Sequence, residues 1–381
     1  MFDIKKINYK VITLCCVLLS LMITYSYAHI GLLYGILELL LVIFCYVMVL
    51  KDLKGPDIYM MVMSSILMFF SVINGIIYTD LKSTFFLSIS IMLPLAISVL
   101  PVDKKHDGNQ FKWGFLTGLT LIFLDNMIGF LGEINSNTRG FYCYMTVAIG
   151  FVWYRSSRKI IPLILILIAS YIAASTGSRN VAIVILVMIF LLILPDAFFK
   201  KKLVYRCIYI AVLFYTIFAL NIMEWIFEQD KLAGWLVEYT DSLSDKQWGM
   251  ESRVYFFRQI EFKLSQMHWY NKLFGEGVLR RHGHNMFYQS LFIYGYIGTL
   301  LIYAMLVRVF EMAYKLICEN DDKIAIGGFV ALIGIVLLNG ADVFLIGTET
   351  CSVIPQVLMG VIMLRYKNVT KEDRLELVEV L

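Results

Sequence analysis

Apolar residues occupy most of this 381-residue chain in long runs that short polar connections separate. A helix needs about 20 apolar residues to cross roughly 30 Å of membrane hydrocarbon. Segments that reach or approach this length cover 11–29, 31–50, 57–79, 83–100, 112–131, 139–154, 159–175, 179–194, 203–221, 285–307, 324–342 and 350–366. The pattern predicts an all-α polytopic membrane protein with about 12 transmembrane helices, in one membrane domain over residues 1–381.

Two interruptions refine this pattern. The run from Ser175 to Arg179 combines a glycine, small polar residues and a charge, and therefore predicts a tight turn between the seventh and eighth helices. A long polar stretch over 221–284 separates the ninth and tenth helices. Within it, Val254, Phe257, Leu264 and Met267 recur at near-helical spacing, so a surface helix is expected from Glu251 to Met267, along the membrane or over a cavity.

Composition excludes a soluble globular domain. Hydrophobic residues make up 60% of the chain and charged residues 16%, whereas soluble proteins have about 45–50% and 25%. The lysines near the N-terminus and the apolar run after them resemble a signal peptide. We interpret this run as an uncleaved first helix because it is long for a signal sequence. The seven cysteines contain no CxxC spacing, which argues against a zinc or redox site.

The distribution of basic residues predicts the orientation in the membrane. If the N-terminus is cytoplasmic, 22 lysines and arginines lie on the cytoplasmic side, three in the short outer loops and eight in the 221–284 loop. Short cytoplasmic loops carry the excess of Lys and Arg in membrane proteins. Both termini are therefore expected in the cytoplasm and the long loop on the outer, periplasmic side. With nine acids against eight bases the loop is nearly neutral, so any role of its arginines is individual.

Three cationic or titratable residues stand at the starts of helices that run inward from the outer side. Arg139 begins the sixth helix, Arg179 begins the eighth, and His284 precedes the tenth. A cation at a helix N-terminus is disfavoured by about 0.3–1 kcal/mol, and a bound anion would relieve this penalty. The coincidence predicts an outward-facing site for a phosphate-containing substrate.

Other interpretations of these residues remain open. Each arginine can reach lipid headgroups or pair with an acid such as Glu133. Asn285 is a good N-cap for the tenth helix, and His284 can then be merely interfacial, while His282 is an alternative to it. Further candidate polar residues are the acids within or beside the predicted helices: Glu38, Asp125, Asp342 and Glu349. Acids within membrane helices are functional candidates. A structural role, in which the buried acid pairs with Tyr or Asn, explains Glu38 or Asp125 equally well.

Several short motifs, in order, resemble those of the bacterial O-antigen polymerase and O-antigen ligase superfamily. Leu273 to Gly277 is similar to its LFGxG element, and His284-Asn285 with the later Gly295 and Gly298 is similar to its re-entry motif. The turn ending in Ser178-Arg179 and the position of Arg253 also match. Thr138-Arg139-Gly140 matches less well, because the Gly-Asn-Pro-Asn that usually follows is missing. The specific part of the resemblance covers roughly residues 170–300.

The resemblance implies a glycosyltransferase of the bacterial inner membrane that needs no metal or cofactor. Its donor would be an undecaprenyl-pyrophosphate-linked oligosaccharide at the periplasmic face, and transfer would invert the anomeric carbon. Arg179 and Arg253 would bind pyrophosphate, with Arg139 as a weaker partner. His284 would activate the acceptor hydroxyl or contact the donor phosphate, so His284 and Arg253 are the expected catalytic residues. Membrane lipids, a chain-length regulator and a flippase are the expected partners, and nucleic acid is not.

Two activities fit this chemistry, and a third function competes with it. A polymerase would join lipid-linked repeat units of a surface polysaccharide, and this is the preferred interpretation. An O-antigen ligase would move the finished glycan to lipid A-core. A transporter of lipid-linked sugars would be expected to have internal repeats and charges at mid-membrane depth. It is less consistent with the sequence, which has no clear repeat and whose candidate cations lie at one surface.

Overall fold

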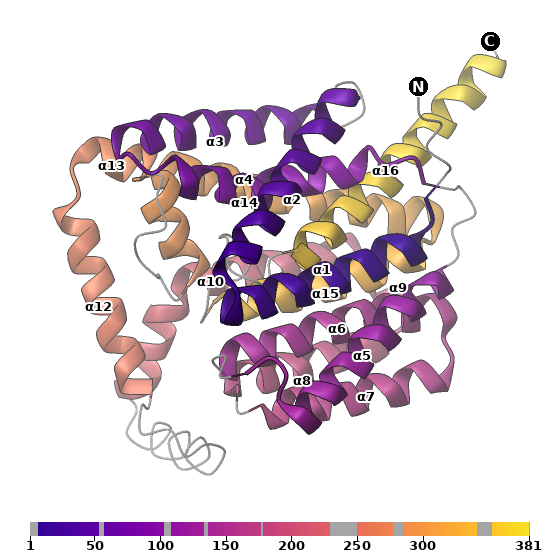
Figure 1. Ribbon diagram of the computed structural model, residues 1–381. Coiled ribbons are helices and arrows are strands. Elements are labelled where there is room, and N and C mark those ends of the chain that lie inside the picture. Colours follow the sequence, from indigo (N-terminus) through magenta and orange to yellow (C-terminus); the bar gives the residue numbers. More distant parts are fainter. Residues whose placement is uncertain are drawn as a thin grey trace.

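The computed structural model describes residues 7–52, 57–102, 108–132, 136–176, 178–228, 250–276, 285–340 and 353–380 (Figure 1). Within these ranges the secondary structure is helical, apart from an isolated parallel bridge between Ile7 and Val102. The predicted all-α class is therefore confirmed.

Among the described residues, one long helix corresponds to each of the twelve apolar segments. The helices are α1 (Tyr9–His29), α2 (Gly31–Lys51), α3 (Ile58–Ile77), α4 (Leu81–Ser98), α5 (Phe111–Ile128), α6 (Ser136–Ser157), α7 (Ile160–Ser175), α8 (Arg179–Ile193), α10 (Lys202–Glu228), α14 (Met286–Asn320), α15 (Lys323–Leu338) and α16 (Val353–Val380). The turn predicted between the seventh and eighth helices separates α7 from α8. The short helices η1 (Gly108–Gln110) and α9 (Asp196–Phe199) precede α5 and α10.

Among the described residues, five helices are long and apolar enough to cross a membrane: α1 over Tyr9–Ser26, α2, α3, α10 over Lys202–Ala219, and α14. Four shorter apolar helical stretches lie in α4, α7, α8 and α15. Helices satisfy their own backbone hydrogen bonds, which hydrocarbon requires. By length and composition, these helices indicate a membrane protein.

One hydrophobic core joins all twelve long helices, and α15 lies inside it. Fourteen of its sixteen residues are buried, and it contacts α6, α8, α10, α14 and α16. Many of the long helices lie side by side across Figure 1, with α9 at the right end of the bundle and α12 and α13 at the left. Because α15 is buried on every side, both of its ends have to meet other polar groups of the protein.

In the described part of the long polar stretch, 221–228 and 250–276, the end of α10 is followed by two further helices. Helix α12 (Met250–Gln266) confirms the expected surface helix, and α13 (Trp269–Phe274) follows it. In Figure 1, α12 runs across the left end of the bundle rather than along it. A small second cluster attaches α12 to the start of α14, through Ile260, Leu264, Met267, Phe287, Tyr288, Leu291 and Phe292.

The predicted tenth helix, 285–307, is interrupted. Gly295 adopts φ 64° and ψ −170° inside α14, which divides it into a first segment, 286–294, and a second segment, 296–320. Gly275 has the similar values φ 78° and ψ −178°. This backbone region is essentially restricted to glycine. The helix then continues well past the predicted end at residue 307.

The two glycines lie back to back. A Cβ on Gly275 would lie 2.2 Å from Ile293 O, and a Cβ on Gly295 would lie 2.3 Å from the Leu273 carbonyl carbon. The Glu276 N–H donates to Phe292 O at 2.7 Å. The motifs around these glycines are thus the contact between the end of α13 and the break in α14.

Alanine at Gly275 or Gly295 is expected to destabilise the protein by about 3 kcal/mol or more, because a Cβ adds backbone overlap to an unfavourable φ/ψ region. Gly129→Ala is the matched control. Gly129 has φ 61°, but no heavy atom lies within 4 Å of the added Cβ. It should cost about 1–2 kcal/mol. Thermal unfolding in detergent measures all three, and equal losses would contradict a close backbone contact between Gly275 and Gly295.

Candidate functional site

The starts of α8 and α14 meet at the C-terminal end of α15. Asn180 Nδ2 donates to Leu338 O at 3.0 Å, and Asn285 Nδ2 donates to Gly340 O at 2.8 Å. Between them, Met286 N donates to Asn339 O at 2.8 Å. The carbonyls of three consecutive residues therefore accept donors from two other helices. We call Asn180, Asn285 and Asn339 the asparagine cluster.

Asn285 is the most constrained member of this cluster. It is fully buried, and its Oδ1 accepts from Phe287 N at 2.7 Å and Tyr288 N at 3.3 Å. This confirms the predicted N-cap. Its Nδ2 also donates to Thr216 O at 2.8 Å in α10, in addition to Gly340 O. The Asn285 side chain therefore links the start of α14 to α10 and to the end of α15. In the sequence, Asn285 directly follows His284.

The start of α6 packs against the same region. A Cβ on Gly140 would lie 2.7 Å from Ser178 Cβ and 2.8 Å from Thr176 Oγ1, so α6 closely approaches the turn between α7 and α8. Tertiary packing thus gathers the starts of α6, α8 and α14 near one end of the bundle. These are the three helix starts that the sequence singled out.

Arg139 forms an ion pair within the protein. Its Nε lies 2.9 Å from Asp125 Oδ2, and its Nη2 donates to Gly132 O at 2.8 Å. Asp125 also accepts from Leu131 N at 2.9 Å. The Asp125 side chain is 5% exposed and that of Arg139 is 31% exposed. Asp125 thus provides the acidic partner considered above, and binding of pyrophosphate by Arg139 stays a prediction.

For Arg179 and Arg253 the structure describes the backbone but not the side chains. Arg179 is the first residue of α8, directly before Asn180, and Arg253 lies in the first turn of α12. His284 and its alternative His282 lie outside the described residues, as do Glu133, Asp342 and Glu349. Arg179 and His284 are each one residue from an asparagine bound to the end of α15. Their roles stay predictions.

The remaining candidates lie elsewhere. Glu38 is buried within α2. Where the structure describes the chain, it holds no group of three or more His, Cys, Asp or Glu arranged to bind a metal ion. The asparagines and the buried Thr216 were not predicted as a cluster, because no spacing in the sequence links residues 180, 216, 285 and 339.

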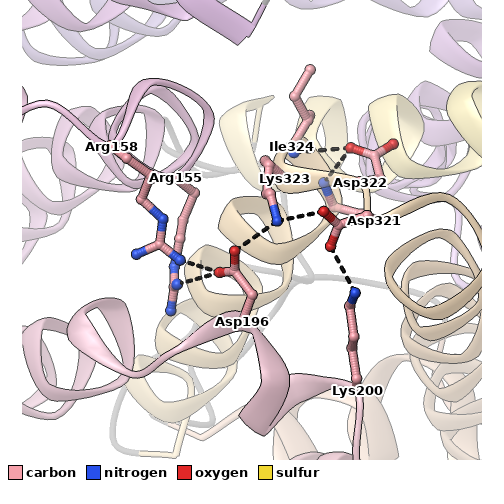
Figure 2. Close-up of polar contacts among 9 residues, drawn as sticks. Arg155, Arg158, Asp196, Lys200, Asp321, Asp322, Lys323 and Ile324 are labelled. Atoms are coloured by element: carbon pink, nitrogen blue, oxygen red, sulfur yellow. Dashed lines mark hydrogen bonds and ion pairs between the residues drawn. The ribbon is translucent and has the colours of Figure 1, made fainter.

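A second polar cluster lies at the opposite end of α15 (Figure 2). Asp196 accepts from Arg155 at 2.8 Å and from Lys323 at 2.7 Å, and it also pairs with Arg158. Lys323 reaches Asp321 at 2.8 Å, and Lys200 lies 2.9 Å from the same carboxylate. These residues form the ion-pair cluster.

This cluster continues into α16 and α1. Arg365 pairs with Asp322 at 2.5 Å and donates to Tyr9 Oη at 3.1 Å, while Asp322 caps α15 through Ile324 N and Ala325 N. Burial raises the pKa of Asp196, but the Lys323 hydrogen bond and the charges of Arg158, Lys323 and Arg155 outweigh it and hold this pKa below its usual range. These ion pairs join residues from several helices at this end of α15.

No protein-family model and no curated protein matches this chain.

Asn285→Ser is expected to lower the free energy of unfolding by about 2 kcal/mol or more. Serine keeps the N-cap oxygen but removes the donor to the buried carbonyls of Thr216 and Gly340. Asn8→Ser is the matched control, because Asn8 caps α1 by accepting from Val11 N at 3.0 Å at an exposed site. Thermal unfolding in detergent compares the two, and a similar loss in both would show that only capping matters.

Asp196→Asn is expected to cost about 3 kcal/mol or more, because it leaves the fully buried Arg155 without its counter-charge. Asp321→Asn is the control. Its side chain is 53% exposed and it also pairs with Lys323, so its loss should cost at most about 1 kcal/mol. Unfolding midpoints in detergent measure both, and an equal effect would contradict the special role of the buried pair.

Proposed function

We propose that this protein is a metal-independent glycosyltransferase that polymerises a bacterial surface polysaccharide from undecaprenyl-pyrophosphate-linked repeat units. One observation carries the proposal: the starts of α8 and α14 bind the carbonyls of the consecutive residues Leu338, Asn339 and Gly340 at the end of α15. Arg179, in a motif that resembles the superfamily's arginine turn, is the first residue of α8, and in the sequence His284 directly precedes Asn285, the N-cap of α14. Because no family model and no curated protein matches, the proposal of glycosyl transfer rests on this resemblance.

The proposed topology has twelve membrane spans, both termini in the cytoplasm and the protein in the inner membrane. The ion-pair cluster would lie at the cytoplasmic end and the asparagine cluster at the periplasmic end. Two features support this arrangement: the bias of Lys and Arg toward one side, and their gathering with acids around Asp196 and Asp322. The 221–284 loop, including α12 and α13, would then be periplasmic.

The proposed reaction is a displacement at the anomeric carbon of the donor sugar. The oxygen of an acceptor hydroxyl attacks C1 from the face opposite the pyrophosphate, which inverts this carbon. The C1–O bond breaks, and its electron pair stays on the pyrophosphate oxygen. The hydroxyl proton passes to His284, which acts as the general base. A histidine suits this step because its pKa lies near neutral pH.

Positive charge supplied by arginines takes the part of a metal ion in this proposal. Negative charge grows on undecaprenyl pyrophosphate as the bond breaks, and planar guanidinium groups bind such oxygens in bidentate fashion. Arg179 and Arg253 are the proposed ligands. Arg139 is the proposed third ligand, and a weaker one because it already pairs with Asp125. Its side chain is still partly exposed and can therefore contact a ligand.

The O-antigen ligase remains the alternative, because its donor is the same and its acceptor, lipid A-core, differs. A strain that lacks the gene distinguishes the two activities. Single repeat units on the core would identify a lost polymerase, whereas bare core with accumulated lipid-linked polymer would identify a lost ligase. A transporter remains the third candidate. Loss of the proposed polymerase should leave newly made repeat units accessible from the periplasm, and loss of a transporter should not.

Arg179→Ala, Arg253→Ala and His284→Ala are each expected to lower polymer formation by at least about 100-fold, because each removes a group that stabilises the transition state. Polysaccharide ladders on gels measure the effect, with protein amounts checked in membranes. Arg258→Ala is the matched control on α12 and should keep normal ladders. Normal ladders in all three site variants would reject the proposed site.

A further inference from the structure

The helices α12 and α13 expose a group of large apolar side chains. Phe262 is 66% exposed, Trp269 72%, Tyr270 42% and Leu273 36%. Neighbouring positions on α12, including Glu261, Lys263 and Ser265, are also exposed but polar. A soluble surface rarely gathers several large aromatic and aliphatic residues in so short a segment. We call Phe262, Trp269, Tyr270 and Leu273 the aromatic patch.

Specific contacts hold α13 against the end of α3. Asn74 Nδ2 donates to Phe274 O at 2.9 Å and to Gly275 O at 3.2 Å. Tyr78 Oη donates to Asn271 Oδ1 at 2.9 Å, and the rings of Phe70 and Phe274 lie 4.8 Å apart. These contacts fix α13 beside the last turn of α3.

This position defines a depth relative to a bilayer. Helix α3 has 20 residues and is one of the five helices able to cross a membrane. At about 1.5 Å per residue it spans roughly the hydrocarbon thickness, so its last turn lies where hydrocarbon meets headgroups. The exposed side chains in the second half of α3 are apolar: Phe69, Val72, Ile73, Ile76 and Ile77. Helix α13 therefore lies at the level where the lipid-facing surface of α3 ends.

The aromatic patch belongs to a larger apolar surface. After the break at Gly295, which touches Leu273 and Phe274, the exposed residues of α14 include Tyr296 and Leu300, at 55% and 71%. Helices α3 and α14, which both expose apolar side chains, therefore both contact the end of α13. Tryptophan and tyrosine are enriched at membrane interfaces, where the ring is buried and its polar atom reaches water.

We propose that α12 and α13 form an interfacial anchor, with the aromatic patch inserted between the lipid headgroups of the leaflet that borders the end of α3. The occupant of this surface is lipid, since the patch adjoins lipid-facing helices and combines apolar rings with polar neighbours. The anchor sets the depth of Gly275 and Glu276, which bind the first segment of α14. This inference does not depend on glycosyl transfer.

The emission of Trp269 in nanodiscs tests the anchor. The difference in fluorescence between the wild type and Trp269→Phe isolates this residue among the six tryptophans. Phenylalanine keeps an apolar ring at an exposed site, and circular dichroism verifies the fold. Nanodiscs are prepared with lipids brominated near the headgroup, with lipids brominated near the acyl terminus, or with unbrominated lipids. Iodide added to the water reports exposure to solvent.

We expect bromine near the headgroup to reduce the Trp269 emission by about half, and bromine near the acyl terminus to reduce it less. The control is Trp153→Phe. Trp153 is 8% exposed and packs on Phe115, so its difference emission should respond to neither lipid nor iodide. Quenching of Trp269 by iodide alone would show an exposed patch in water. Insensitivity to all quenchers would show that protein covers it. Either result overturns the proposal.

Discussion

Burial of the C-terminal end of α15 imposes the constraint on which the candidate site depends. The last carbonyls of a helix have no partners within it, and a buried carbonyl without a donor costs about 1–3 kcal/mol. Leu338, Asn339 and Gly340 are buried, and their carbonyls accept from α8 or α14. The starts of two other helices thus supply the donors that the end of α15 requires.

The opposite end of α15 meets the same requirement with charges. Asp322 caps the helix through two backbone N–H groups and binds Arg365. Lys323 pairs with Asp196, which also pairs with Arg155. Neutral amides at one end and ion pairs at the other leave α15 joined at both ends to its neighbours. The buried helix thereby links the starts of α8 and α14 to one element, as the proposed cationic site would require.

The long polar stretch takes part in this frame through backbone contacts. Gly275 and Gly295 allow the chain after α13 to touch the break in α14, where any side chain would collide with backbone. The first segment of α14 consequently lies between two restraints: Asn285 at its start and the glycine contact at its end. In the sequence, His284 directly precedes this doubly held segment.

The sequence by itself determined the helical class, the twelve apolar segments, the surface helix α12 and the cap at Asn285. These follow from local periodicity and capping, which need no knowledge of distant residues. Only the tertiary structure decided that Asn285 also binds Thr216 and Gly340, that Arg139 pairs with Asp125, and that α14 breaks at Gly295. Each depends on a partner remote in the chain or on the close approach of another segment. Hydrophobic periodicity is a local property and predicts neither.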